Sequence, residues 1–396
     1  MSWDHLIGQS SAQEYLRSAL RSGRVAHTYL FKGPSGVGKR TAAYLFAQVA
    51  LCHHPSTPDT PCGQCQSCRW FAGRKGAVIG HPDVIALLKF NTTSGEKLVG
   101  DHEMMIGLET VQYVCEQLHR SPMSGRRRVA IIPEAQRMCR GQAESANAFL
   151  KTLEEPPEPS LIILTSSQPE GLLETITSRT QAVQFKRLSA EEVRQGIVRV
   201  AAGSSPEDMA TAALLADGSL GRARELLHGD LRNWRAAVLK ELARFGTLSC
   251  PAFGIALATL AEAEGKRLFA AEKETKKAEA GDSSENTETE GEESDGQLKT
   301  ELAWKRYVFR RLLELIEICF RDALVCAATG DPNATLLLQP DQRQLTQSLA
   351  RNFGEAGCQK ALLAIREAWS AVRLYVRHDV VARFLAGKLL EALIAH

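Results

Sequence analysis

A glycine-rich loop near the beginning of the chain constrains its fold more than any other feature. The loop reads Gly33-Pro34-Ser35-Gly36-Val37-Gly38-Lys39. Closely spaced glycines let successive backbone N–H groups turn toward one phosphate, and the lysine adds a positive charge there. The apolar residues 29–31 precede the loop, and an apolar helical pattern covers residues 41–52 after it. We therefore predict a buried strand, a phosphate-binding loop and a helix, in that order.

The residue after the lysine departs from the usual pattern of such loops. Ser or Thr normally stands there, and its hydroxyl holds the Mg²⁺ ion that lies between the terminal phosphates. Here the residue is Arg40, and the hydroxyl of Thr41 comes one position later. That step turns a side chain by about 100° around the helix. Residues 33–39, Arg40 and Thr41 are thus the candidate ATP contacts, but the usual Mg²⁺ ligand is missing.

A second apolar strand ends in a sequence that affects the same metal position. In phosphate-loop ATPases such a strand usually ends in Asp-Glu, where Asp positions the ion and Glu activates the attacking water. This chain has Pro133-Glu134 there. Glu134 is a candidate general base, although a helix cap or a surface position is the simpler interpretation. Two losses at one ion predict weak or absent ATP hydrolysis.

The apolar runs predict a parallel sheet in the first part of the chain and helices alone in the rest. Residues 129–132 and 161–164 are two more expected buried strands, and a helix over 145–155 ends at Pro156-Pro157. Short apolar runs between amphipathic helices are typical of an α/β fold. From about residue 189 helical periodicity takes over. The predicted domains are an α/β domain over 1–187, a small helical domain over 188–230 and an all-helical domain over 231–396.

An acidic segment interrupts the helical part of the chain. Residues 281–296 contain acids but no bases and no large apolar side chains. Such a segment buries too little surface to offset the entropy lost when it becomes ordered. We expect a disordered insertion around 271–298, which would be a spacer or an acidic interaction segment.

Four of the ten cysteines form a candidate metal site: Cys52, Cys62, Cys65 and Cys68. Three of them follow one another at two-residue gaps, and the first comes from the end of the preceding helix. Four thiolates complete a tetrahedral shell around Zn²⁺ and leave no position for a substrate, so the predicted role is structural. Zinc is preferred over iron for this site. The alternatives are reduced thiols without metal, or His53 or His54 in place of one thiolate.

The totals argue against a membrane protein and against a globally basic nucleic-acid-binding protein. The formal charge is +2, so any contact with DNA would need a local patch. Residues 126–128 form one basic cluster. It could contact DNA phosphates, and the alternative is a solvated charged turn. No apolar run approaches the roughly 20 residues that span a bilayer, and the first residues lack a signal-peptide pattern. We expect a cytoplasmic protein.

Several further motifs occur in a fixed order along the chain. Ile7-Gly8-Gln9 and residues 27–31 precede the loop, the cysteines follow it, and later come Leu150-Lys151-Thr152-Leu153-Glu154-Glu155-Pro156-Pro157 and Thr177-Ser178-Arg179. Together they resemble the clamp loader of bacterial DNA polymerase III, within the AAA+ superfamily. The resemblance is strong over residues 1–230 and weaker beyond. It implies an AAA+ P-loop domain with an inserted zinc module over 52–68, a helical lid and a helical collar domain.

The same resemblance implies a role for the chain within a complex. In this family the gamma or tau subunits hydrolyse ATP, and the delta prime subunit supplies an arginine to an adjacent motor subunit. Three positions make the chain look like delta prime: Arg40, Pro133 and Gly221. Motor subunits carry Arg at the position of Gly221. Arg179 would then be the arginine finger that acts in trans, although Thr180 follows it where Cys is usual. The implied partners are the gamma/tau and delta subunits, the sliding clamp and, through the complex, primer-template DNA.

Two other functions fit the same residues. The chain could be a divergent gamma/tau-type motor that uses Thr41 and Glu134 around an unusual Mg²⁺ geometry. It could also be a zinc-containing nucleic-acid-binding protein in which the loop is only a scaffold. Magnesium-dependent turnover by the isolated chain would favour the motor, and tight DNA binding without other subunits would favour the second function.

Overall fold

The computed structural model of the chain describes residues 2–72, 80–87, 89–92, 95–98, 106–124, 126–139, 144–200, 204, 206–245, 250–279, 301–331 and 337–394. The chain divides into two compact units. The first comprises Met1–Ala202 and Ala216–Ala223, and the second comprises Gly203–Leu215 and Arg224–His396.

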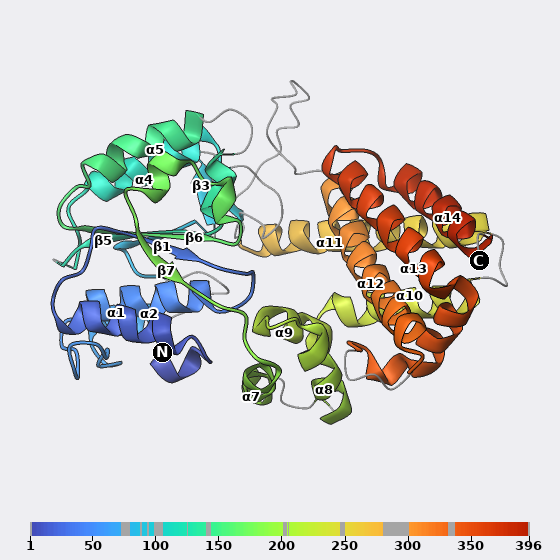
Figure 1. The fold of residues 1–396 in the computed structure, drawn as a ribbon. Helices are drawn as coiled ribbons and strands as arrows, with labels where there is room; N and C mark the ends of the chain where they lie inside the picture. Colours follow the sequence, from blue (N-terminus) through green and yellow to red (C-terminus); the bar gives the residue numbers. More distant parts are fainter. Residues whose placement is uncertain are drawn as a thin grey trace, which may run out of the picture. The chain divides into compact units, whose positions relative to one another are not determined.

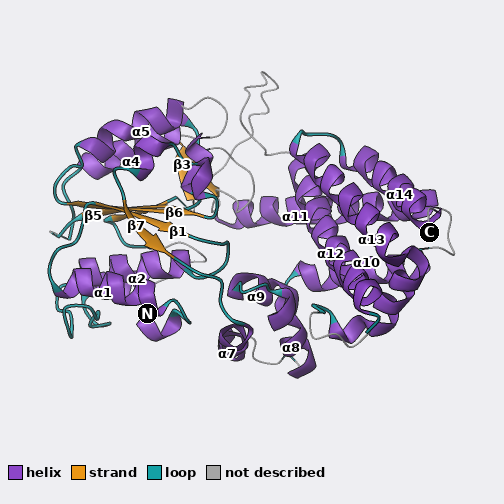
Figure 2. Cartoon of the chain, viewed as in Figure 1, coloured by secondary structure: helices purple, strands orange, loops and turns teal. Residues whose placement is uncertain are grey.

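The first unit is built on a five-stranded parallel sheet, drawn in orange in Figure 2. The order across the sheet is β2-β5-β6-β1-β7, so β1 lies between β6 and β7. This confirms the predicted α/β class with a parallel sheet. The strands are β1 (Thr28–Lys32), β2 (Val84–Ala86), β5 (Arg128–Ile132), β6 (Ser160–Ser166) and β7 (Gln181–Gln184).

Helices cover both faces of this sheet, with α1 and α2 on one face and α4 and α5 on the other (Figure 1). Alternate strand residues point to the two layers: Phe31 and Ile131 belong to the core beneath α1 and α2, whereas Ile132 and Leu164 belong to the core beneath α4 and α5. Because both faces are buried, β1, β5 and β6 each contain an unbroken apolar run. The helices are α1 (Ser10–Arg21), α2 (Lys39–Leu51), α4 (Leu108–His119) and α5 (Glu144–Glu154).

Two strands of the sheet were not predicted. β7 is an edge strand whose sequence, Gln-Ala-Val-Gln, buries only Val183, so it has no apolar run. β2 has only three residues, which is shorter than the runs that identify a strand. A separate antiparallel pair joins β3 (Lys89–Thr92) to β4 (Gly95–Leu98). Shorter elements of the first part are η1 (Trp3–His5), α3 (Gln66–Ala72), η2 (Ala135–Cys139), η3 (Pro169–Gly171) and α6 (Glu174–Thr177).

After β7, every helix or strand element among the described residues is a helix, as expected. α7 (Ala190–Val200) belongs to the first unit, α8 (Pro206–Leu215) to the second, and α9 (Leu220–His228) begins in the first and ends in the second. The predicted small helical domain over 188–230 is therefore divided between the two units. The three-domain limits stay a prediction.

The second unit is a helical assembly of α10 (Asp230–Arg244), α11 (Cys250–Glu279), α12 (Glu301–Thr329), α13 (Arg343–Arg373) and α14 (His378–Ile394), with η4 (Pro340–Gln342) before α13. Aromatic rings pack between these helices; Phe320 of α12 and Phe353 of α13 meet edge to face with centroids 5.0 Å apart. α13 is kinked at Gly354, whose φ is +57°.

The range predicted to be disordered begins too early. α11 continues to Glu279, so residues 271–279 are helical rather than disordered. Ala, Glu and Lys dominate this stretch, and they are strong helix formers even without a buried face. The acidic segment 281–296 lies outside the described residues.

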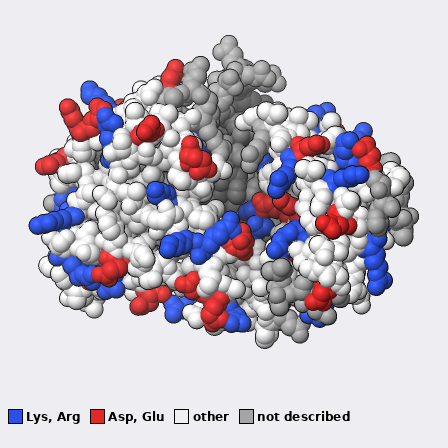
Figure 3. Space-filling model, in the orientation of Figure 1, with Lys and Arg blue, Asp and Glu red and all other residues white. Residues whose placement is uncertain are grey.

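Acidic and basic side chains are interspersed over the face drawn in Figure 3. Of the helices that the structure describes, none combines the length and the apolar character needed to cross a membrane.

Candidate nucleotide and metal sites

The glycine loop connects the end of β1 to the start of α2, as predicted. Gly33 leaves β1 with φ at +147°, and its N–H donates to the Ser166 carbonyl over 3.1 Å. A Cβ atom at Gly33 would lie 2.2 Å from the Phe185 carbonyl oxygen, so the position has no space for a side chain. Gly38 is the residue before the first turn of α2, with φ at +105°. The loop therefore carries the chain to a helix N-terminus, where N–H groups face outward.

Lys39 is buried and contacts the loop itself. Its Nζ donates to the carbonyl oxygens of Gly33 at 2.5 Å and Pro34 at 2.6 Å. Burial lowers the pKa of Lys39, and the nearby charge of Glu134 offsets only part of this effect. A phosphate entering the loop would compete with these two carbonyls for the ammonium group.

The loop also touches the first turn of α9. The Gly221 N–H donates to the Gly36 carbonyl over 3.1 Å. A Cβ atom at Gly36, whose φ is +71°, would lie 2.1 Å from Ser219 Oγ. The first turn of α9 therefore lies directly against the phosphate-binding loop. The Ser219 hydroxyl accepts the Arg222 N–H over 3.2 Å.

Arg40 and Thr41 occupy different surroundings in the first turn of α2. The Arg40 side chain is exposed, whereas Thr41 is half-buried. The structure thus places a cation where the usual hydroxyl would stand, which matches the predicted loss of a Mg²⁺ ligand.

Glu134 lies at the carboxyl end of β5, held in a network that the sequence did not predict. Its backbone is left-handed, with φ at +49°. Its carboxylate accepts Gln136 Nε2 at 2.7 Å and the Ser167 N–H at 3.1 Å, and the Ser167 hydroxyl donates to the same oxygen. Burial alone would raise the pKa of Glu134, but the hydrogen bonds from Ser167 and Gln136 outweigh it and lower the pKa. Such a carboxylate is a weak proton acceptor.

Arg179 lies just beyond α6, with a partly exposed side chain. Its Nη2 pairs with Glu154 Oε1 at 2.7 Å, and the side-chain exposures are 36% and 51%. Arg179 and Glu134 thus come from different elements, and the structure records no bond between them among the residues that it describes.

The four cysteines converge as the spacing predicted. Cys52 follows the last residue of α2, and Cys68 lies in α3. Their sulfur atoms are 3.6 Å apart, those of Cys52 and Cys62 are also 3.6 Å apart, and those of Cys62 and Cys68 are 4.0 Å apart. Four sulfurs placed 2.3 Å from one zinc ion in a tetrahedron are about 3.8 Å apart. The cluster therefore fits Zn²⁺ geometrically.

Backbone N–H groups surround these sulfurs. Cys62 Sγ accepts the N–H groups of Cys65 at 3.3 Å and Gln64 at 3.5 Å. The Cys65 and Gln64 N–H groups lower the pKa of the Cys62 thiol to about 6. Among the described residues, the candidate metal set is Cys52, Cys62, Cys65 and Cys68, without His53 or His54.

His81 supports the cysteine cluster, although the sequence did not single it out. Burial lowers the pKa of His81 to about 4, so the ring is neutral at pH 7. Nδ1 accepts the Asp83 N–H at 3.0 Å, and the opposite nitrogen therefore carries the proton that it shares with Ser67 Oγ at 2.9 Å. This bond ties α3 to the segment before β2.

The basic cluster 126–128 is only partly a solvated turn. Arg126 is exposed, but Arg128 is buried at the start of β5. The Arg128 guanidinium donates to the carbonyl oxygens of Arg120, Ser121 and Pro82. The Arg128 charge therefore stabilises the fold and is not part of a basic surface patch.

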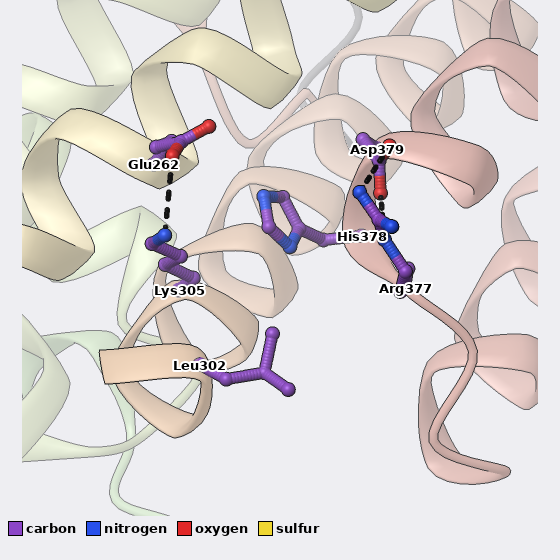
Figure 4. A pocket seen from close by; sticks show the side chains of 6 residues that line it. All are labelled: Glu262, Leu302, Lys305, Arg377, His378 and Asp379. Carbon is purple, nitrogen blue, oxygen red and sulfur yellow. Dashed lines mark hydrogen bonds and ion pairs between the residues drawn. The ribbon is translucent and has the colours of Figure 1, made fainter. Parts of the chain in front are cut away.

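A pocket of about 350 Å³ lies in the second unit, and none of the predicted site residues lines it (Figure 4). Two ion pairs flank it, Lys305 with Glu262 and Arg377 with Asp379. Between them lies the ring of His378, and both of its nitrogens are inaccessible and lack a hydrogen-bond partner in the described part of the chain. Because the charges are paired and the ring nitrogens are covered, we assign no ligand to this pocket.

One family profile and three sequence relatives of this chain all represent DNA polymerase III subunits. Residues 8–189 match the sequence profile of the family described as DNA polymerase III, delta subunit. The tau/gamma subunit of Haemophilus influenzae is 34% identical over 195 residues, which cover 49% of this chain and 25% of that protein. The tau subunit of Escherichia coli is 31% identical over 271 residues, covering 67% of this chain and 39% of that protein.

The delta' subunit of Bacillus subtilis is 28% identical over 199 residues, which cover 50% of this chain and 54% of that protein. The chain thus spans between a quarter and about half of the length of these relatives. A solved structure, a DNA polymerase III gamma subunit-related protein from Thermotoga maritima, is 15% identical, with 96% of this chain and 99% of that chain covered and a TM-score of 0.42.

Proposed function

We propose that this chain is a clamp-loader subunit of bacterial DNA polymerase III, like the relatives to which it is similar, and that it serves as the delta prime subunit. In this role it supports ATP-driven loading of the sliding clamp onto primed DNA in the cytoplasm while hydrolysing little ATP itself. Its proposed partners are the gamma/tau and delta subunits, the clamp and, through the complex, primer-template DNA.

The surroundings of Glu134 carry the proposal of weak hydrolysis. A general base must accept a proton from the attacking water, and its pKa should lie near the working pH. The carboxylate of Glu134 is instead engaged by Ser167 and Gln136, which lower its pKa. Arg40 and Pro133 stand where an ATPase would hold Mg²⁺. Phosphate binding in the loop stays compatible with this arrangement, but efficient hydrolysis does not.

The exposure of Arg179 supports its proposed action in trans. A guanidinium stabilises the negative charge that develops on a transferring phosphoryl group, and it must reach that group from the surface of its own subunit. Arg179 lies at such a surface and is anchored rather than buried.

We also propose that Cys52, Cys62, Cys65 and Cys68 hold Zn²⁺. A closed shell of four thiolates has no open position, so the ion would supply folding energy rather than catalysis. The residues of the cluster would then fix the end of α2 against α3.

The first test is ATP turnover by the isolated chain in the presence of Mg²⁺. We expect no turnover above that of the Lys39→Ala variant, which removes the loop ammonium and reports contaminating activity. Sustained turnover that disappears in Lys39→Ala would make the chain a motor subunit and would contradict the proposal.

The second test uses the reconstituted clamp loader. Arg179→Ala should leave assembly intact and lower DNA-stimulated hydrolysis by the complex at least 10²-fold, since arginine fingers contribute about 10³–10⁵ in rate. Arg194→Ala is the control, because Arg194 is also an exposed, ion-paired arginine. Unchanged hydrolysis in a verified Arg179→Ala complex would remove the finger assignment.

A gamma/tau-type motor is the second candidate function, because tau and tau/gamma subunits are also among the relatives. The tau and tau/gamma relatives are 31% and 34% identical to this chain, whereas the delta' relative is 28% identical. In a motor, Thr41 and Glu134 would have to act around an altered Mg²⁺ position. The turnover experiment separates this candidate from the delta prime proposal.

A further inference from the structure

An ion pair joins the proline-terminated run 150–157 to the proposed finger. Glu154, the last residue of α5, belongs to the run 150–157, and Arg179 follows α6. Arg179 Nη2 and Glu154 Oε1 are 2.7 Å apart. Pro156 and Pro157 follow one residue later, after Glu155, and prevent α5 from continuing. The carboxylate therefore stands at a fixed helix terminus rather than on a loop.

Two further bonds orient the same guanidinium. Nη1 donates to the Thr175 carbonyl at 3.1 Å and to the Ser178 hydroxyl at 3.4 Å. The guanidinium is planar, and both of its terminal nitrogens have partners: Nη1 makes the two hydrogen bonds and Nη2 makes the ion pair. Because the partners come from α5 and from the α6 segment, they fix the plane of the group from two directions.

This ion pair contributes little to stability. Both side chains are partly exposed, and exposed ion pairs have small net energies because water screens them. Glu155, the next residue, is also exposed and carries the same charge. Removing either carboxylate should therefore leave the fold intact, and Glu155 provides a matched control.

We infer that Glu154 is a positioning residue for Arg179, an inference that rests on the proposed action of Arg179 in trans. A long arginine side chain must lose rotamer freedom before it can meet a phosphate, and a site that is already ordered avoids this cost at the moment of reaction. Small misplacements of a catalytic group lower rates strongly. Glu154 acts through its ion pair with the guanidinium. Glutamine keeps an acceptor oxygen at the same place but lacks the charge, so it should preserve part of the effect.

The experiment measures DNA-stimulated ATP hydrolysis by the complete clamp loader with variants of this chain, after assembly is verified. Glu154→Ala should lower kcat about tenfold with little change in KM for ATP. Glu154→Gln should retain more activity than Glu154→Ala, and Glu155→Ala should match the unmodified chain. In the Arg179→Ala background, Glu154→Ala should cause no further loss, because its effect passes through the guanidinium.

The outcomes separate this inference from the proposed function. Suppose that Arg179→Ala slows hydrolysis, whereas Glu154→Ala leaves the rate unchanged or raises it. The positioning role is then wrong and the finger assignment stands. A further loss in the double variant, or equal losses in Glu154→Gln and Glu154→Ala, would also overturn the positioning role. If the complex with Arg179→Ala hydrolyses ATP at the normal rate, the proposed function itself fails.

Discussion

Gly36 shows how closely the phosphate-binding loop and the start of α9 approach each other. Its φ of +71° is a left-handed conformation, and its carbonyl accepts the Gly221 N–H. A Cβ atom at Gly221 would lie 3.2 Å from Gly36 Cα, which is closer than side chains normally come. An arginine at position 221, as the resemblance implies for motor subunits, would therefore require the loop to move. The close approach of the loop to α9 therefore depends on glycine at both positions, 36 and 221.

We predict that Gly36→Ala lowers the free energy of unfolding by about 2–4 kcal/mol, from backbone strain and from the contact with Ser219. Gly23→Ala separates the two causes, because Gly23 has φ at +69° but open space around it. It should cost about 1–2 kcal/mol from strain alone. Urea unfolding gives both values. Equal losses in the two variants would show that the contact with Ser219 costs nothing.

His378 is a buried histidine without a hydrogen-bond partner for either ring nitrogen in the described chain. Burial lowers its pKa, so the folded protein takes up a proton on this ring at lower pH than the unfolded chain does. The unfolded histidine binds a proton near pH 6.5. Below that pH the unfolded state holds more protons, and the free energy of unfolding must therefore fall.

We predict that His378→Leu makes the stability of the second unit less sensitive to acid and costs little near neutral pH, since an apolar group replaces an unsatisfied polar one. The measurement is urea unfolding on both sides of about pH 6.5. His27→Leu is the control, because the His27 side chain is 51% exposed. An unchanged pH dependence in His378→Leu would contradict the prediction.

β5 begins with an arginine whose charge lies inside the first unit. The Arg128 side chain is 9% exposed, and its Nη1 lies 3.8 Å from the buried carboxylate of Asp83. Asp83 in turn accepts the N–H groups of Met123 and Ser124, both at 2.7 Å. This network joins the start of β5 to the segment before β2, so the edge of the sheet depends on a charged residue rather than on apolar packing.

We expect Arg128→Met to destabilise the first unit by about 3 kcal/mol, because the variant leaves carbonyl groups and the Asp83 charge buried without their partner. Arg126→Met changes the same charge at an exposed position and should shift stability by less than about 0.5 kcal/mol. Thermal unfolding compares the two. If both variants change stability to a similar extent, the charge of Arg128 contributes no more than an exposed charge does, and the prediction is wrong.

The chain as a whole consists of two units with separate sources of stability. The first contains the sheet and the cysteine cluster, and the second is held by helix packing around residues such as Phe309, Phe320 and Phe353. A metal in the cysteine cluster would therefore stabilise only the first unit.

Removal of zinc by a chelator should lower the melting temperature of the first unit by roughly 5–10 °C, which corresponds to a loss of about 3 kcal/mol. Hydrogen exchange should become faster in α2 and α3 but not in α12 and α13. Cys68→Ser should have the same effect, whereas Cys139→Ser, outside the cluster, should not. A uniform change across both units would argue against a local zinc site.

Prediction from the sequence was most successful where local chemistry and burial agree. The strands around Phe31, Ile131 and Ile163 each contain an unbroken run of apolar residues because both faces of the sheet are covered. The edge strand β7 was missed because it is polar, and pairing with β1 rather than composition makes it a strand. The cysteine spacing also predicted which thiols converge, since three of the four lie within one short segment.

The sequence alone determined the change from an α/β part to a helical part, the glycine loop with its altered neighbours Arg40 and Pro133, and the cysteine cluster, because these depend on residues close together in the chain. Tertiary structure decided the rest: the bonds of Ser167 and Gln136 to Glu134, the partner of Arg179, and the inward direction of Arg128. Each of these depends on side chains from separate elements, and their meeting follows from packing around the sheet rather than from any local pattern.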